Sequence, residues 1–350
     1  NAIARASRKY LPQYYSARRP ILSYYFFNFD NSKIQSQTIL YETRDGQSIT
    51  DSPLYIFLEL VKNEKYNNRR HVWVLKDAVS EQEALVNVPL EFRDRIEIVR
   101  RDTIEYMKWL LEAEYVITNS TFQSFYAKRP GQTYINTWHG TPLKYMGYDI
   151  PGSKTSLKNV QRNFLMTDYL LSPNEHTTHI FADRYKLNGL YEGKILEAGY
   201  PRNDVLQRRD ETILGQLVAD GVQLNGKLIV LYTPTWKGTS ITNPSGSMQQ
   251  IVAEVNVIQA MNPDKQVLVK VHPYAYSMAK QEQNLVDILI PDQYDANRVL
   301  SVTDYLITDY SSIFFDFLVT GRPIFFYAWD KEQYDLYRGM YLEDSELPAP

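Results

Sequence analysis

The stretch VLVKVHPY, Val267 to Tyr274, contains an apolar run that ends at a histidine and a proline. A continuous apolar run rich in β-branched residues is typical of a strand buried in a parallel sheet. Lys270 interrupts the run, and a lysine inside a buried strand is costly without a partner. We therefore predict a strand at 267–271, with an anion as the partner of Lys270 and His272 at its carboxyl end. The structural alternative is that His272 caps the strand through a backbone carbonyl.

Similar short runs recur along the chain and form two series. Each run ends in a polar or glycine-containing turn and precedes helix-compatible sequence, which is the pattern of parallel α/β architecture. The predicted strands lie at 38–42, 71–75, 96–99, 115–118, 134–137, 169–172 and 195–198, and then at 228–233, 267–271, 305–308 and 323–327. Helices are expected to begin near Pro53, Thr103, Ser156 and Asn174, and to span 248–261 and 312–319.

The two series predict two domains, which the length of 350 residues also favours. We assign residues 31–205 to an N-terminal Rossmann-like domain and residues 206–350 to a C-terminal Rossmann-like domain. Ligands of open α/β sheets bind outside the carboxyl ends of the strands. We therefore expect two doubly wound domains that face a central cleft, with the reactive side chains at strand ends.

Composition excludes several classes of protein. With 44% hydrophobic residues, 23% charged residues and a net charge of -3, the chain is typical of globular proteins, and bulk nucleic-acid binding is not indicated. The absence of cysteine excludes disulfides, thiolate metal sites and cysteine nucleophiles, and fits a reducing cytoplasm. The chain has no P-loop, dinucleotide-binding or nucleophile-elbow sequence. His176 and His179 have no third ligand at a recognisable spacing, which argues against a zinc site.

The first 30 residues form a basic aromatic segment. Up to residue 29 it has no acidic residue, and its cations are Arg5, Arg8, Lys9, Arg18 and Arg19. This pattern suits contact with an anionic membrane surface. An equally weighted alternative is a solvated basic helix followed by a buried strand at the aromatic run 24–27. No apolar run approaches the ~20 residues of a membrane-spanning helix, and the start at Asn1 suggests that upstream sequence is missing.

The stretch NTWHGTPLK, Asn136 to Lys144, follows a predicted strand. A histidine at a strand end, here His139, can act as a base near neutral pH. Gly140 allows close approach of a ligand, Thr141 and Lys144 add a hydroxyl and a cation, and Pro142 suits the start of a helix. The alternative is a polar loop with a hydrogen-bonded histidine, but the density of polar groups favours a site.

The stretch TDYSSIFFDF, Thr308 to Phe317, runs from a predicted strand into an aromatic helix. Hydroxyls and backbone amides at a helix start can hold a diphosphate. The alternative is an ordinary helix cap. The candidate phosphate-binding or nucleotide-binding side chains of this stretch are Thr308, Asp309, Ser311, Ser312 and Asp316.

Two shorter stretches complete the set of candidate residues. AGYPRND, Ala198 to Asp204, supplies Arg202, whose guanidinium can hold phosphate oxygens bidentately. LYTPTWKG, Leu231 to Gly238, supplies Thr235 at the end of the first strand of the second domain. Both stretches also read as simple turns.

In this order, NTWHGTPLK, AGYPRND, YTPTWKG, VKVHP and TDYSSIFFDF resemble the CDP-glycerol glycerophosphotransferase family of teichoic acid and capsule polymer synthesis. DSPLYIFLEL at Asp51, VITNSTF at Val116, GRPIFFYAWD at Gly321 and RGMYLED at Arg338 extend the resemblance over roughly residues 37–350. It implies a GT-B-like fold with an acceptor-side domain at 31–205, a CDP-donor domain at 206–350 and catalytic histidines at His139 and His272. The resemblance places Thr235 and the TDYSSIFFDF side chains in donor binding. The residues that it places on the acceptor side or in support are Gly140, Thr141, Lys144, Asn203 and Asp204. The family continues beyond the RGMY-type segment, so we expect the C-terminal end of the second domain to be missing here.

The resemblance implies transfer of a polyol phosphate from CDP-glycerol or CDP-ribitol to an undecaprenyl-type lipid-linked acceptor, with release of CMP. It places the protein peripherally at the cytoplasmic face of the membrane. In such a reaction His139 is the candidate base, and His272, Lys270 and Arg202 are candidates for neutralising the diphosphate. No obligatory metal is predicted, because the stretches contain no carboxylate cluster suited to Mg²⁺, although Asp309 keeps Mg²⁺ dependence open.

Two alternatives from other classes remain. A GT-B sugar-nucleotide glycosyltransferase has the same architecture, because fold does not fix reaction type. A non-catalytic membrane-surface protein that retains the fold is the second alternative. Glycerol versus ribitol, primase versus polymerase, and the oligomeric state are not encoded in recognisable residues.

Overall fold

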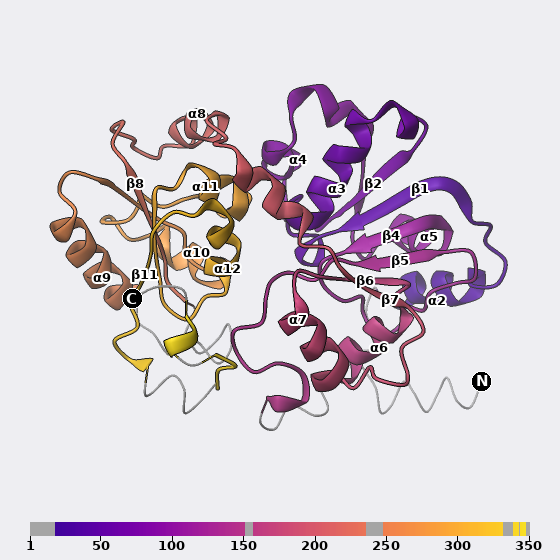
Figure 1. Cartoon of the computed structure of the whole chain (residues 1–350). Helices are drawn as coiled ribbons and strands as arrows, with labels where there is room; N and C mark the ends of the chain where they lie inside the picture. Colours follow the sequence, from indigo (N-terminus) through magenta and orange to yellow (C-terminus); the bar gives the residue numbers. More distant parts are fainter. Residues whose placement is uncertain (1–17, 151–156, 236–247, 332–338, 343, 348–350) are drawn as a thin grey trace, which may run out of the picture. The chain divides into compact units, whose positions relative to one another are not determined.

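The computed structural model describes residues 18–150, 157–235, 248–331, 339–342 and 344–347. Its backbone divides into two compact units (Figure 1). Unit 1 comprises residues 1–139, 158–172 and 187–198, and unit 2 comprises residues 140–157, 173–186 and 199–350. The chain thus enters unit 2 at Gly140 and returns twice before its final crossing after Ala198. The sequence-based boundary at 205/206 stays a prediction.

Unit 1 is built on a parallel sheet with the strand order β3-β2-β1-β4-β5-β6-β7. The strands are β1 (Gln35–Glu42), β2 (Arg70–Leu75), β3 (Ile96–Arg100), β4 (Ala113–Thr118), β5 (Thr133–Asn136), β6 (Tyr169–Ser172) and β7 (Lys194–Glu197). The order reverses between β1 and β4, which makes the carboxyl ends of these two strands the topological switch point. All seven strands lie where the sequence predicts them, within two or three residues at each end.

Helices cover both faces of this sheet. Alternate residues of β1 point to opposite faces: Leu40 packs in one core with α5 (Ile104–Glu112), and Tyr41 packs in a second core with α3 (Asp51–Lys62). The other helices are α2 (Arg18–Asn28), α4 (Glu81–Ala84) and α6 (Lys158–Met166). Burial on both faces explains why the strands read as nearly continuous apolar runs.

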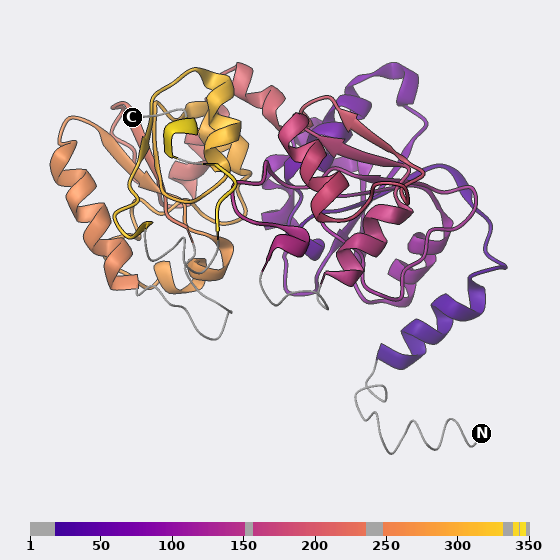
Figure 2. The same ribbon diagram turned by 60° about the horizontal axis from the view of Figure 1, so that its bottom comes forward.

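Helix α2 contains the aromatic run Tyr24 to Phe27, so the sequence-based alternative of a buried strand there is wrong. Tyr25 is buried in unit 1, where its hydroxyl donates a hydrogen bond to the Ala127 carbonyl. Phe26 and Phe27, in contrast, are 59% and 79% exposed. Figure 2 shows α2 at the periphery of this unit. A strand would place Tyr25 and Phe27 on the same face, whereas the helix buries Tyr25 and exposes both Phe26 and Phe27. Residues 1–17 of the predicted membrane segment lie outside the described residues.

Unit 2 is built on a second parallel sheet, ordered β11-β10-β8-β9. Its strands are β8 (Ile229–Thr233), β9 (Gln266–Val269), β10 (Tyr305–Thr308) and β11 (Ile324–Phe326). Its helices are α7 (Glu175–His179), α8 (Thr212–Ala219), α9 (Met248–Met261), α10 (Pro273–Ala279), α11 (Ala296–Val302) and α12 (Ile313–Phe317). The strand order reverses between β8 and β10, so this sheet has its own switch point. Helix α9 has the predicted bounds.

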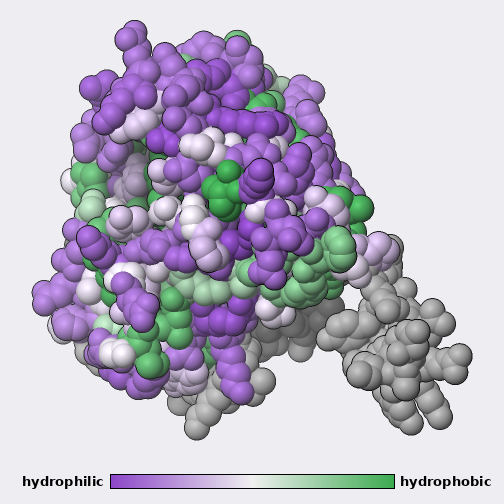
Figure 3. Space-filling view, turned by 90° about the vertical axis from the view of Figure 1, so that its right-hand side faces the viewer, coloured by the Kyte–Doolittle hydropathy of each residue, from purple (hydrophilic) through white to green (hydrophobic). Residues whose placement is uncertain are grey.

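The face drawn in Figure 3 is largely hydrophilic, with apolar side chains in small separate groups. Within the described residues no helix is long and apolar enough to span a bilayer.

Candidate functional site

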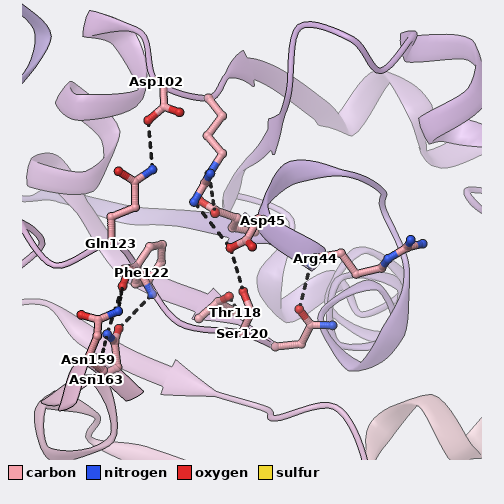
Figure 4. Close-up of polar contacts among 12 residues, drawn as sticks. Arg44, Asp45, Asp102, Thr118, Ser120, Phe122, Gln123, Asn159 and Asn163 are labelled. Carbon is pink, nitrogen blue, oxygen red and sulfur yellow. Dashed lines mark hydrogen bonds and ion pairs between the residues drawn. The ribbon is translucent and has the colours of Figure 1, made fainter. Parts of the chain in front are cut away.

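Polar side chains gather at the carboxyl ends of β1, β3 and β4 in unit 1. Buried Glu42 accepts hydrogen bonds from Arg101 Nε, at 2.9 Å, and from the Tyr106 hydroxyl, at 2.6 Å. Burial raises the pKa of Glu42, and the Arg101 charge opposes that rise. Arg101 also lies 3.5 Å from Asp45, which accepts a hydrogen bond from the Ser120 hydroxyl (Figure 4). These contacts fix the loops that surround the switch point.

The loop after β5 is tied to the loop after β4. Thr137 N donates to the Thr118 carbonyl at 2.8 Å, and Asn136 Nδ2 donates to the Ser120 carbonyl at 2.6 Å. The Asn136 amide oxygen accepts from Trp138 N, which lies in the left-handed region with φ 53°. Trp138 is buried, and its ring lies 4.0 Å from that of His139. These backbone contacts therefore place His139 at the surface of unit 1 in a defined orientation.

His139 Nδ1 lies 2.7 Å from the backbone carbonyl oxygen of Asn119. A carbonyl oxygen only accepts hydrogen bonds, so Nδ1 must carry a proton. In the neutral ring Nε2 then has the lone pair. This is the tautomer that an imidazole needs in order to take a proton at Nε2.

The residues after His139 belong to unit 2, and Pro142 does not start a helix there. Residues 141–146 have no helical turn. Instead, Lys144 forms an antiparallel bridge with Met340, flanked by hydrogen bonds from Tyr145 N to Gly339 O and from Tyr341 N to Leu143 O. The sequence prediction failed because this extended stretch finds its partner about 200 residues away. The RGMY-type segment thereby supports the stretch that carries Thr141 and Lys144.

Arg202 and Asp316 form a buried ion pair in unit 2, with 2.8 Å between Nη2 and Oδ2. A methyl group at Gly140 would lie 3.3 Å from Ser312 Oγ and 3.6 Å from Arg202 Nη2. Four sequence-predicted residues from three distant stretches therefore meet, and Gly140 leaves room for the contact. Asn203 accepts a hydrogen bond from Asn297 at 2.9 Å, and Asp204 is exposed nearby in the chain.

Thr235 and Asp309 meet at the switch point of the second sheet. The Asp309 carboxylate accepts hydrogen bonds from Thr235 N at 2.9 Å and from Tyr310 N at 2.6 Å. The Thr235 hydroxyl is buried and has no hydrogen-bond partner among the described residues. Among the predicted donor residues Thr308 differs, because its hydroxyl is fully buried and donates to the Thr233 carbonyl. This geometry favours a structural role for Thr308.

The segment after β9 differs in detail from the predicted strand. Strand β9 ends at Val269, so Lys270 is outside it and donates from Nζ to the Tyr294 carbonyl at 3.1 Å. His272 is exposed and accepts a hydrogen bond at Nδ1 from Tyr274 N at 3.3 Å, which caps α10. The histidine therefore caps a helix, whereas the structural alternative had it cap the strand. With Nδ1 accepting, the neutral ring carries its proton on Nε2.

The other histidines of unit 2 have structural contacts. His176 Nε2 lies 2.8 Å from the Pro142 carbonyl, and His179 lies 3.5 Å from Glu175. Among the described residues no cluster of three potential metal ligands occurs. Sequence reasoning assigned no role to Asn119 or Asp51, although both lie in stretches that carry the family resemblance. Their only sequence signal is position: Asn119 follows a predicted strand, and Asp51 lies at the start of a predicted helix.

Comparison with known proteins identifies the family. The model of the CDP-glycerol:poly(glycerophosphate) glycerophosphotransferase family matches residues 23–350. The chain is 32% identical to a teichoic acid poly(glycerol phosphate) polymerase of Staphylococcus epidermidis, covering 94% of this chain and 45% of that protein. It is 31% identical to a teichoic acid glycerol-phosphate transferase of Staphylococcus aureus, covering 91% of this chain and 82% of that protein.

A solved structure of the wall teichoic acid polymerase TagF superposes on this chain with a TM-score of 0.76, at 30% identity, over 95% of this chain and 81% of that one. The fold with its two parallel-sheet units is therefore GT-B-like. The chain spans about 45% of the length of the S. epidermidis relative. The match of the family model over nearly the whole chain shows that this protein belongs to the CDP-glycerol:poly(glycerophosphate) glycerophosphotransferase family.

Proposed function

We propose that this protein transfers glycerol phosphate or ribitol phosphate from a CDP-activated donor to a hydroxyl of a lipid-linked teichoic acid or capsule-type acceptor. Membership of the family supports the CDP donor and the teichoic acid acceptor. The observation that carries the proposal is the hydrogen bond between His139 Nδ1 and the Asn119 carbonyl. It holds the tautomer that a general base requires.

In the proposed reaction the acceptor oxygen attacks the β-phosphorus of the donor. A new oxygen–phosphorus bond forms, and the bond from the β-phosphorus to the bridging oxygen breaks, so that CMP leaves with the electron pair. His139 Nε2 takes the acceptor's hydroxyl proton, which later passes to solvent. Positioning and neutralisation of the developing charge supply most of the rate enhancement in phosphoryl transfer.

Unit 2 supplies the donor-binding groups in this proposal. His272 presents Nε2–H as a hydrogen-bond donor, and Lys270 adds a cation near it in the chain. Ser311 and Ser312 follow β10 at the switch point, where Thr235 and Asp309 are already joined. Ligands of open α/β sheets bind at such points. Arg202 and Asp316 are assigned to hold Ser312 and the turn at Gly140 in place.

Product analysis tests the proposed function. The protein is incubated with CDP-glycerol, CDP-ribitol and a panel of sugar nucleotides, together with a lipid-linked acceptor, and the products are read by mass. We expect release of CMP and addition of one polyol phosphate mass per step. Nucleoside diphosphate release from a sugar nucleotide alone would instead favour a glycosyltransferase. If the protein is a non-catalytic surface protein, no product forms. Repeating the assay with EDTA tests the prediction that no metal is obligatory.

We also propose a peripheral position at the cytoplasmic membrane face. Helix α2 has no acidic residue and exposes Phe26 and Phe27 while Tyr25 anchors it to unit 1. Exposed aromatic residues on a helix without acidic residues favour contact with a bilayer surface. We expect Phe26→Ser/Phe27→Ser to weaken co-sedimentation with phosphatidylglycerol vesicles, whereas Leu90→Ser, at a similarly exposed apolar residue, leaves it unchanged. Equal losses in both variants would contradict this placement.

A further inference from the structure

Behind His139 lies a buried polar group that the proposed reaction does not use. Asn119 directly follows β4, is only 2% exposed and provides the carbonyl that accepts the His139 Nδ1 hydrogen bond. It lies at the β1/β4 switch point of the first sheet. The orientation of this one peptide unit therefore sets the tautomer and the direction of the His139 ring.

The Asn119 side chain is itself fixed at both ends. Its Nδ2 donates to the Asp51 carboxylate at 2.8 Å, and its Oδ1 accepts from Arg44 N at 3.0 Å. Because a backbone N–H only donates, Oδ1 must face Arg44. The amide nitrogen is then obliged to face Asp51, whose carboxylate only accepts. The two contacts define one orientation of the amide and exclude the flipped one.

Both partners of Asn119 adopt backbone conformations that residues other than glycine rarely take. Asp51 has φ 62° and Arg44 has φ 48°. Such conformations are strained and persist where surrounding contacts enforce them. Asp51 is held by a second hydrogen bond, from Ser52 N to Oδ1 at 2.5 Å. Between β1 and α3 the backbone is thus strained at Arg44 and Asp51, the two residues that hydrogen-bond the Asn119 side chain.

We propose that Asp51 is a positioning residue for His139, acting through Asn119. The Asp51 carboxylate fixes the Asn119 amide, the fixed residue holds its carbonyl toward Nδ1, and that carbonyl keeps the proton on Nδ1 and the lone pair on Nε2. The inference rests on the proposed role of His139 as the base. It adds to that role a chain of hydrogen bonds from the start of α3 to the reacting nitrogen.

The chain of contacts offers a swap experiment. In Asp51→Asn an NH₂ group replaces one of the two acceptor oxygens. It then faces Asn119 Nδ2 or Ser52 N, so that two hydrogen-bond donors oppose each other. In Asn119→Asp two carboxylates face each other. In the double variant Asp51→Asn/Asn119→Asp, the new carboxylate accepts from Arg44 N and from the new amide, while the amide oxygen accepts from Ser52 N. The hydrogen-bond pattern is restored with the charge moved by one residue.

We expect each single substitution to lower kcat with CDP-glycerol by about tenfold, a typical effect for a group one step removed from a functional ligand, while the KM for the donor stays unchanged. The double variant should recover most of the loss. Glu97→Gln is a matched control, because it also replaces a paired carboxylate of unit 1, in the exposed pair with Arg70. It should leave kcat unchanged.

A structural role alone would lower stability without changing the ring, so the tautomer is read directly. In two-dimensional ¹H–¹⁵N spectra of the histidine rings, with the His139 signals assigned by their loss in His139→Ala, the wild type should show protonated Nδ1. Asp51→Asn should show a mixture of tautomers, and the double variant should return to one. Single variants that unfold at lower temperature but keep the tautomer and kcat would overturn the proposal.

Failure of the positioning role of Asp51 can be distinguished from failure of the proposed function. If wild-type protein releases CMP from neither CDP-glycerol nor CDP-ribitol, the proposed function is wrong, whereas the tautomer measurement still tests whether Asp51 and Asn119 fix the His139 ring. If CMP is released and depends on His139 but not on Asp51, only the positioning role fails.

Discussion

His139 in unit 1 and His272 in unit 2 both follow a strand of a parallel sheet, but their rings are held in opposite ways. His139 donates from Nδ1 to the Asn119 carbonyl, whereas His272 accepts at Nδ1 from Tyr274 N. In the neutral state the first ring has its lone pair on Nε2 and the second has its proton there. The contrast suits one ring to accept the acceptor's proton and the other to donate a hydrogen bond to phosphate.

The contrast also shows why similar sequence contexts lead to different hydrogen bonding of the two rings. HGTP and VHP each place a histidine at a strand end, and the sequence does not tell which ring nitrogen will be engaged. That choice depends on the neighbouring backbone: a carbonyl of the loop after β4 in one case, and the first amides of α10 in the other. Backbone polar groups near each ring therefore determine the tautomer of its neutral form.

Removing the base from His139 should have the largest effect. His139→Asn keeps a side-chain N–H that can donate to the Asn119 carbonyl, but it has no basic nitrogen. We expect kcat to fall by roughly 10²-fold or more, the scale of lost general base assistance, with little change in donor KM. Steady-state CMP release measures both constants.

His179→Ala is the matched control for that substitution, because His179 is an exposed histidine whose contact is with Glu175 on the same helix. It should retain wild-type turnover. If His139→Asn kept full activity, the assignment of the base to unit 1 would be wrong.

Substitutions of His272 should separate capping of α10 by Nδ1 from the proposed hydrogen bond of Nε2–H to the donor phosphates. Their expected effect on kcat/KM is smaller than that of His139→Asn. Asparagine can accept from Tyr274 N and is a favoured helix cap, but it lacks a donor at the position of Nε2. Glutamine is longer and places an amide N–H near that position. If the donor role dominates, His272→Gln retains more kcat/KM than His272→Asn, which falls about tenfold or more, the worth of a hydrogen bond to a charged group.

The reverse order of activity between the two His272 variants would show that capping of α10 is what matters. Thermal unfolding of both variants separates this outcome from a general loss of stability.

Much of the fold could be predicted from periodicity and strand-end signals. Strands such as Tyr169–Ser172 and the helix Met248–Met261 lie at their predicted positions, because local pattern and tertiary environment agree there. Pro142 misled the prediction, since its segment pairs with Met340 across a long sequence separation. Helix α2 was ambiguous because an aromatic run suits both a strand and a helix whose faces differ in exposure.

The sequence indicates which residues belong to the candidate site but not the contacts among them. Arg202 and Asp316 were both assigned to donor binding, yet their pairing joins residues more than a hundred positions apart and follows only from the tertiary structure. Asn119 acts through its backbone carbonyl, which every residue possesses. No side-chain pattern can reveal such a contact, so the residue that orients the candidate base was missed.

A third histidine, His71, lies in the core and has no role in the proposed reaction. Its substitution should have the smallest effect, a change in the pH dependence of stability. His71 is buried in β2 and bonds the Tyr41 hydroxyl at 3.0 Å. Burial lowers the pKa of His71 from 6.5 to about 4, with Arg95 and Arg69 adding to the effect. Since the unfolded chain binds a proton at this residue below pH 6.5 and the folded chain does not, stability falls as pH falls from 6.5 toward 4.

His71→Gln keeps an acceptor for Tyr41 and removes the titration. Between pH 6.5 and 5.5 the free energy of unfolding of the wild type should fall by about 1 kcal/mol more than that of the variant, as measured by urea unfolding at both pH values. Turnover per folded molecule at neutral pH should be the same in both, because His71 is in the core of unit 1. Equal pH dependence in the two proteins would mean that His71 is protonated as readily in the fold as outside it. The contrast among histidines would then reduce to His139 and His272 alone.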